Sequence, residues 1–203
     1  MCIRDRRIAD QLGIEPVKGG IHPRFGTRNM ILPLTDHQYV EVVTVLEHPA
    51  ADKAPFGQAV RARSEAGGGW LGWVVEVPDL APFEQKLGRP SAPGGRIFPD
   101  GRRLDWHQIG VKGLIADPQL PFMIHFDSAD EMHPSQARLT DVSLTGMEIA
   151  GSPERVTDWL GGPVEDVLRS VDVTWSAPHG TPGLLAVTFG TPDGPVTILS
   201  LIH

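Results

Sequence analysis

The chain has 203 residues, of which 40% are hydrophobic and 21% charged, and its net charge is -7. This composition is that of a folded protein with a core of its own, and the acidic balance argues against nucleic acid or an anionic membrane as a partner. No apolar run reaches the length of a membrane span, and the single cysteine is typical of a reducing compartment, so we expect a cytoplasmic protein without disulfides.

The chain begins MCIRDRRIADQLG, and its RRIADQLG stretch is typical of the last turns of an amphipathic helix that ends at Gly13. The opening six also back-translate to ATG-TGT-ATA-AGA-GAC-AG, the transposon end used in sequencing libraries. We therefore interpret residues 1–6 as adaptor-derived and expect the natural chain to extend further upstream.

Short strands separated by turns are predicted through the middle of the chain, in keeping with its 19 prolines and 23 glycines. Two β-branched runs come first, and a strand and a helix that Asp79 can cap follow them. After a turn-rich segment come two further strands. In chain order, the expected strands cover 27–34, 37–46, 70–77, 102–111 and 120–127, and the helix covers 78–88.

The final third has the order of strand, helix and three strands, and we interpret the middle of the chain as the same unit. Its helix, 152–161, has Ser152 as its expected N-cap. The front of the chain shows the same order without the first strand. We therefore predict an α+β fold of three βαβββ modules that form curved mixed sheets. The expected strands of the last module cover 138–149, 171–176, 183–190 and 196–202.

Paired βαβββ modules are the signature of the vicinal oxygen chelate superfamily of glyoxalases and extradiol dioxygenases. Four ordered stretches, GGIHPRFGTRN, YVEVV, GWVVEVPDL and LPFMIHFD with its following HPS, resemble the glyoxalase-like domain family of bacterial proteins. The resemblance implies a glyoxalase-like domain over 7–135 that lacks its first strand, and an additional module over 136–203. It also implies a homodimer as one state of the protein.

The resemblance further implies a cup between modules one and two, where a divalent metal (Zn, Ni, Fe or Mn) acts as a Lewis acid on the substrate. Glu41 and His125 stand at two ligand positions, Gly72 stands at a third, and the fourth falls on the absent strand. Two other interpretations stay open: Glu41 can be a solvent-facing strand residue, and His125 an ordinary core or surface histidine.

Polar and aromatic residues elsewhere are candidates for the same cup. We interpret His22, Thr27 and Asn29 as substrate-binding residues near its mouth, with Trp106 as an aromatic wall. Glu76 and His107 are candidate catalytic acid or base groups. The alternatives are turn formation, strand initiation, core packing and surface charge. The candidates in full are His22, Thr27, Asn29, Trp106, Glu76 and His107.

Two functions are consistent with these residues. The first is a glyoxalase-like metalloenzyme that carries out isomerase, lyase or dioxygenase chemistry on a small organic molecule. The second is a metal-free protein that binds or sequesters such a molecule on the same fold. Gly72 favours the second, because its side chain cannot ligate a metal.

Overall fold

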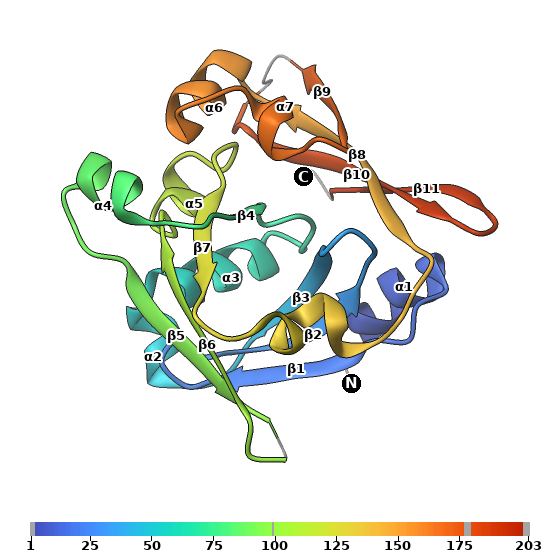
Figure 1. The fold of residues 1–203 in the computed structure, drawn as a ribbon, viewed down its shortest axis with the longest axis horizontal. Coiled ribbons are helices and arrows are strands. Elements are labelled where there is room, and N and C mark those ends of the chain that lie inside the picture. Colours follow the sequence, from blue (N-terminus) through green and yellow to red (C-terminus); the bar gives the residue numbers. More distant parts are fainter. Residues whose placement is uncertain (1–2, 99, 177–179, 201–203) are drawn as a thin grey trace.

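Residues 3–98, 100–176 and 180–200 are described by the computed structural model, and they form three sheets (Figure 1). The end of the expected strand 196–202 and the start of the expected segment 1–6 lie outside these residues. No described helix is long and apolar enough to cross a membrane.

Module one begins with helix α1 (Ile3–Leu12), which ends at Gly13 with φ 65°, as its sequence predicts. Three antiparallel strands follow in the order β1-β2-β3. The pairing of β1 with β2 shifts register between Lys18 and Ile21, where two glycines stand. The strands and the helices after them are β1 (Val17–His22), β2 (Thr27–Pro33), β3 (Tyr39–Val45), α2 (Pro49–Lys53) and α3 (Pro55–Glu65).

Module two has the strand order β4-β7-β6-β5, in which its first strand pairs in parallel with its last. The strand expected over 70–77 is limited to three residues. Trp70 and Trp73 precede this strand, and their indole nitrogens donate to the carbonyls of Ile198 and Gln119. The elements are β4 (Val74–Glu76), α4 (Ala81–Leu87), β5 (Ala92–Ile97), β6 (Arg103–Ile109), α5 (Gly113–Ala116) and β7 (Phe122–Phe126).

Module three keeps the βαβββ element order but has a different strand order, β11-β10-β8-β9. Here β8 pairs in parallel with β9, so the first strand pairs with the second rather than with the last. Ser152 caps its helix as expected, accepting a bond from the Arg155 amide. The elements are β8 (Ser143–Ala150), α6 (Pro153–Leu160), α7 (Val164–Val167), β9 (Asp172–Ser176), β10 (Gly183–Thr191) and β11 (Gly194–Leu199).

Two predicted strand starts are corrected by local turns. The strand expected from Arg138 starts at Ser143, because the Thr140 hydroxyl accepts a bond from the Val142 amide and holds a turn there. The strand expected from His37 starts at Tyr39, because His37 has a positive φ of 60° that an extended strand does not accommodate.

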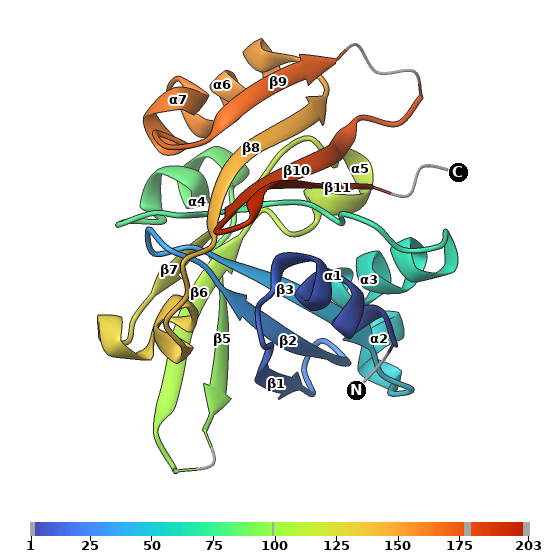
Figure 2. The ribbon, with the colours of Figure 1, turned by 90° about the vertical axis from the view of Figure 1, so that its right-hand side faces the viewer.

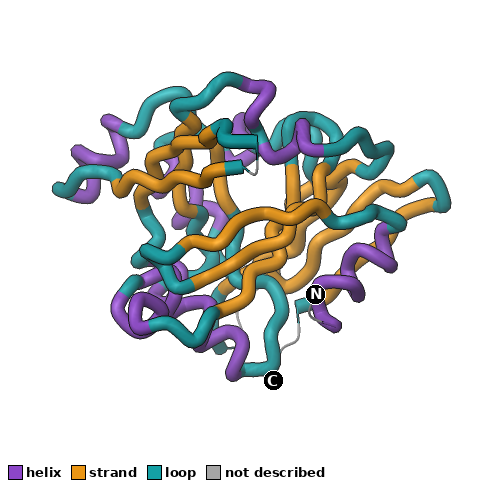
Figure 3. The backbone as a smooth tube through the Cα atoms, turned by 90° about the horizontal axis from the view of Figure 1, so that it is seen from below, coloured by secondary structure: helices purple, strands orange, loops and turns teal. Residues whose placement is uncertain are grey.

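A single buried cluster joins the three modules. It includes Leu32 of β2, Met123 of β7 and Phe189 of β10, each without exposed surface. The sheet of module three lies above the other two in Figure 2, and the view from below in Figure 3 shows most helices at the periphery of the strands. Residues 7–135 and 136–203 therefore share one core.

Modules one and two meet along β1 and β5, which contact each other in Figure 1. Two arginines tie this junction, since Arg24 donates to the Pro93 carbonyl and Arg96 to the Lys18 carbonyl. The 3₁₀ turns η1 (Asp130–Met132) and η2 (Pro134–Ala137) follow β7 and lead on to module three.

Candidate functional site

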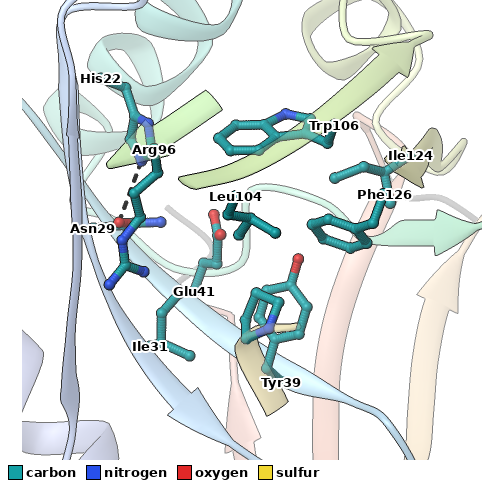
Figure 4. Close-up of a pocket in the computed structure, with 11 residues that line it drawn as sticks. His22, Asn29, Ile31, Tyr39, Glu41, Arg96, Leu104, Trp106, Ile124 and Phe126 are labelled. Carbon is teal, nitrogen blue, oxygen red and sulfur yellow. Dashed lines mark hydrogen bonds between the residues drawn. The ribbon is translucent and has the colours of Figure 1, made fainter. Parts of the chain in front are cut away.

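A pocket opens between the sheets of modules one and two (Figure 4). The volume of the cavity is about 30 Å³, and it opens to solvent. Strands β1 to β3 and β5 to β7 supply most of its lining. The lining residues are His22, Asn29, Ile31, Tyr39, Glu41, Arg96, Leu104, Trp106, Ile124, Phe126 and Pro134.

Strand alternation determines which side chains of each strand face the pocket. Side chains two residues apart share a face, so β3 contributes Tyr39 and Glu41, and β6 contributes Leu104 and Trp106. Figure 4 shows Glu41 near His22, Asn29 and Arg96, and the rings of Trp106 and Phe126 on the other side. The pocket therefore has one polar and one largely apolar wall.

The irregular part of β1 positions the polar wall. The Gly20 amide donates to Asn29 Oδ1 at 2.6 Å, and His22 Nε2 lies 3.4 Å from the same oxygen. A Cβ on Gly19 would stand 2.0 Å from Asn29 Oδ1. The register shift and its glycines thus make the space that Asn29 occupies.

Glu41 is the carboxylate among the residues that line the pocket. The surrounding protein atoms withdraw it from bulk water and raise its pKa, while a hydrogen bond from Asn29 and the charge of Arg96 lower the pKa by smaller amounts. The side chain still keeps an exposed surface, because it faces the open hollow. A carboxylate with a raised pKa that a small molecule can reach is suited to accept a proton.

The neighbours of Glu41 supply hydrogen-bond donors and one positive charge. The Arg96 guanidinium lies 4.1 Å from the centre of the Phe98 ring and donates to the Lys18 carbonyl at 3.0 Å. Burial lowers the pKa of His22, which favours a neutral imidazole. Burial and the charges of two glutamates raise the pKa of Tyr39 well above its ordinary value, so its phenol stays protonated.

The predicted substrate-binding residues divide between pocket and core. His22, Asn29 and Trp106 line the pocket. Thr27 does not: it is completely buried, and its hydroxyl has no hydrogen-bond partner among the described residues. The position next to a turn suggested a ligand contact, but Thr27 starts β2 with its side chain turned into the protein.

Glu41 and His125 are not brought together as the predicted metal pair. Ile124 and Phe126 of β7 line the pocket, so the alternation of the strand turns His125 to the opposite face. There its Nδ1 lies 3.0 Å from the Val77 carbonyl oxygen. His107 pairs with His125 across the ladder and shares this outer face, where its Nδ1 lies 2.8 Å from Asp127 Oδ2.

The donors around Glu41 do not fit a bound metal. At the third ligand position, a Cβ on Gly72 would stand 2.7 Å from Leu114 Cδ2, so the site has no room for a ligating side chain without a shift. Among the described residues, His22 is the one histidine that lines the pocket, and its Nε2 faces Asn29. A catalytic metal normally keeps three protein ligands, and this pocket does not assemble them.

Glu76 instead lies beside two histidines that the sequence did not associate with it. Glu76 Oε2 is 3.3 Å from His37 Nε2 and 3.6 Å from His133 Nε2. The two imidazole rings stack with centroids 3.6 Å apart and planes 16° apart. These residues come from three separate segments, so no spacing in the sequence reveals the cluster.

His133 is the buried member of this cluster. Burial and the nearby His37 lower its pKa to about 4, against a smaller opposing effect of Asp130. Its Nδ1 lies 2.8 Å from Ser135 Oγ and accepts a longer bond of 3.3 Å from the Ser135 amide. Neutral imidazole is therefore its form near pH 7.

Curved sheets of βαβββ modules around a pocket define the class of the protein, the glyoxalase or vicinal oxygen chelate fold. Residues 4–164 match the family model described as glyoxalase-like domain, so the chain belongs to this family. The match starts within the segment 1–6 and continues past residue 135 through α6, further in both directions than the resemblance in the sequence indicated.

A solved structure supports the fold independently. A hypothetical protein from Staphylococcus aureus is similar with a TM-score of 0.65 and 16% sequence identity, over 87% of this chain and 81% of that one. A comparison with curated proteins finds no match. At this identity the structural likeness concerns the fold alone, so the function must be argued from the pocket.

Proposed function

We propose that the pocket between modules one and two binds a small, flat organic molecule without the help of a metal. The observation that carries this proposal is the opposition of Glu41, on the polar wall, to Trp106 and Phe126 on the apolar wall. Such a pocket suits a ligand with an apolar ring at one end and a hydrogen-bond donor at the other.

Each wall has a distinct role in this proposal. The rings of Trp106 and Phe126 contact the ring of the ligand and exclude water from it. The Glu41 carboxylate accepts the hydrogen bond of a ligand hydroxyl and, because its pKa is raised, can take the proton as well. Arg96 then stabilises the negative oxygen left on the ligand, and the proton resides on Glu41.

Isomerase, lyase or dioxygenase chemistry that depends on a divalent metal is the second candidate function. Its support is the membership of the glyoxalase-like family, whose resemblance implies a metal in the cup. The geometry favours the first candidate, because the donors around Glu41 do not converge on a metal. A cytoplasmic location and a homodimer remain predictions from the sequence.

Phenol and toluene are a matched pair of probes for the proposal, because they share a ring and differ in one hydroxyl group. We expect phenol to bind more tightly than toluene in calorimetric titrations with EDTA present. A hydrogen bond to a charged acceptor contributes about 1.5–3 kcal/mol, so Glu41→Gln should reduce the preference for phenol at least ~10-fold. Trp106→Leu should weaken the binding of both phenol and toluene.

His107→Ala is the control, since this residue follows Trp106 on β6 but faces the other side of the sheet. It should leave the binding of both probes unchanged. Absence of phenol binding, or a preference that survives Glu41→Gln, would overturn the proposed role of the pocket. Binding that disappears in EDTA would favour the metal-dependent candidate instead.

A further inference from the structure

We propose that His37, Glu76 and His133 form a binding site for one divalent transition-metal ion of the Zn²⁺ type. Two imidazoles and one carboxylate are a ligand set that such ions take. The proposal is independent of the function proposed for the pocket, because none of the three side chains lines it.

The distances between ligand atoms suit such an ion. Zn²⁺ with tetrahedral bonds of about 2.0–2.1 Å holds its ligand atoms roughly 3.3–3.4 Å apart. Glu76 Oε2 lies 3.3 Å from His37 Nε2 and 3.6 Å from His133 Nε2, and all three ligand atoms lie within 4.8 Å of one another. Among the described residues, no other group of three or more such side chains comes this close together.

The site is exposed to solvent at His37 and Glu76 and buried at His133. The side chains of His37 and Glu76 are 38% and 39% exposed, whereas that of His133 is 4% exposed. Binding of a metal by Nε2 requires the His133 proton on Nδ1, so the 3.3 Å bond that Nδ1 accepts from the Ser135 amide would be given up. Nδ1 would then donate to Ser135 Oγ, which lies 2.8 Å away. A hydrogen bond of this kind commonly orients a ligating histidine.

Because the rings of His37 and His133 stack, one of them must turn before both can bind the same metal ion. Nitrogen lone pairs lie in the ring plane, so two nearly parallel rings do not point at one ion. One ring must turn, and His37 is the one with room, because it is exposed and lies in the turn between β2 and β3. Binding would thus replace the stacking contact by two metal bonds.

An ion at this site would link modules one and two. His37 belongs to module one and Glu76 to β4 of module two, while His133 follows β7. The His133 ring also packs edge-on against Tyr39 and Phe126, at centroid distances of 5.3 and 5.0 Å. Both of these rings line the pocket, so the ion would lie behind the pocket wall rather than in it.

The direct test is a titration of the full chain with ZnCl₂ near neutral pH. We expect one Zn²⁺ per chain and an affinity at least ~10-fold lower for Glu76→Gln. His37→Asn should weaken binding similarly. Asparagine tolerates the positive φ of this position, so the variant removes the imidazole and keeps the turn.

Two further measurements separate the site from accidental binding. His107→Ala removes a histidine that also pairs with a carboxylate, and it should leave the affinity for Zn²⁺ unchanged. In long-range ¹H–¹⁵N spectra, Zn²⁺ should shift the Nε2 signals of His37 and His133. Equal affinity of Glu76→Gln and wild type, no binding, or unchanged Nε2 signals would overturn the proposal.

Discussion

Glu41 supplies the carboxylate of the pocket lining, and the protein raises its pKa. Protein atoms withdraw its carboxylate from bulk water more than Asn29 and Arg96 compensate, so the folded chain holds the proton more tightly than the unfolded chain does. By linkage, the charged carboxylate lowers stability above this raised pKa, and its cost disappears as the pH falls toward the ordinary value for a glutamate. Such a cost is typical of residues kept for function.

Glu41→Gln should therefore make the protein more stable at pH 8, by a small amount on the order of 0.5 kcal/mol because water reaches the hollow. The gain should shrink as the pH falls through the raised pKa of Glu41. Urea unfolding of the wild type and of Glu41→Gln at pH 8 and pH 5 measures this difference in stability. A variant that is less stable at pH 8, or a difference independent of pH, would contradict this account of Glu41.

Strand β5 shapes the pocket through a glycine as well as through the side chain of Arg96. Gly94 lies opposite Trp106 in the antiparallel pair, and a Cβ there would stand 2.2 Å from Trp106 Cε2. The indole therefore occupies the space that the side chain of any other residue at position 94 would fill. The same principle applies to β1, where the lack of a side chain on Gly19 leaves room for Asn29.

Gly94→Ala should displace the Trp106 ring and reduce phenol binding, at a cost in stability of about 1–3 kcal/mol from overpacking. Gly113→Ala is the matched control, because a Cβ at this helical position meets no atom within 4 Å. The control should keep its binding and match or exceed wild-type stability. Equal phenol affinity of wild type and Gly94→Ala would contradict the role of this close contact.

Many elements could be predicted from local sequence, but the pairing of the strands could not. Strand β5 was also missed, because its residues 92–97 lie in the segment expected to be turn-rich. Capping residues such as Ser152 and runs of β-branched residues mark elements along the chain. Alternation along β3 puts Tyr39 and Glu41 on one face of the strand. It did not say which face of β7 meets the pocket, so His125 was placed there although Ile124 and Phe126 take that position. The cluster around Glu76 depends on contacts between distant segments.

The three modules share one large buried cluster, and a smaller cluster of Leu104, Trp106 and Ile124 lies within module two. Phe189 of β10 has no exposed surface and belongs to the same cluster as Leu32 and Met123 of the first two modules. Module three differs from module two in strand order, yet its sheet completes this cluster. The chain should therefore unfold as a single cooperative unit.

Phe189→Ala should cost about 3–5 kcal/mol, the usual loss for a buried phenylalanine. Because the core is shared, the variant should lower the unfolding midpoint for all three modules together. Far-ultraviolet circular dichroism and tryptophan fluorescence should report coincident transitions in both proteins. Separate transitions, with module three unfolding first, would contradict a shared core.

The central claim is that a small molecule binds between modules one and two, where the sheet face that carries Glu41 lies opposite the sheet face that carries Trp106. The most direct measurement is a map of ¹H–¹⁵N chemical shifts as phenol is added in the presence of EDTA. The account predicts shifts at the Trp106 indole, at His22 and along β3, with little change at His107 and His125. Shifts confined to the His107 and His125 face, or none at all, would contradict it.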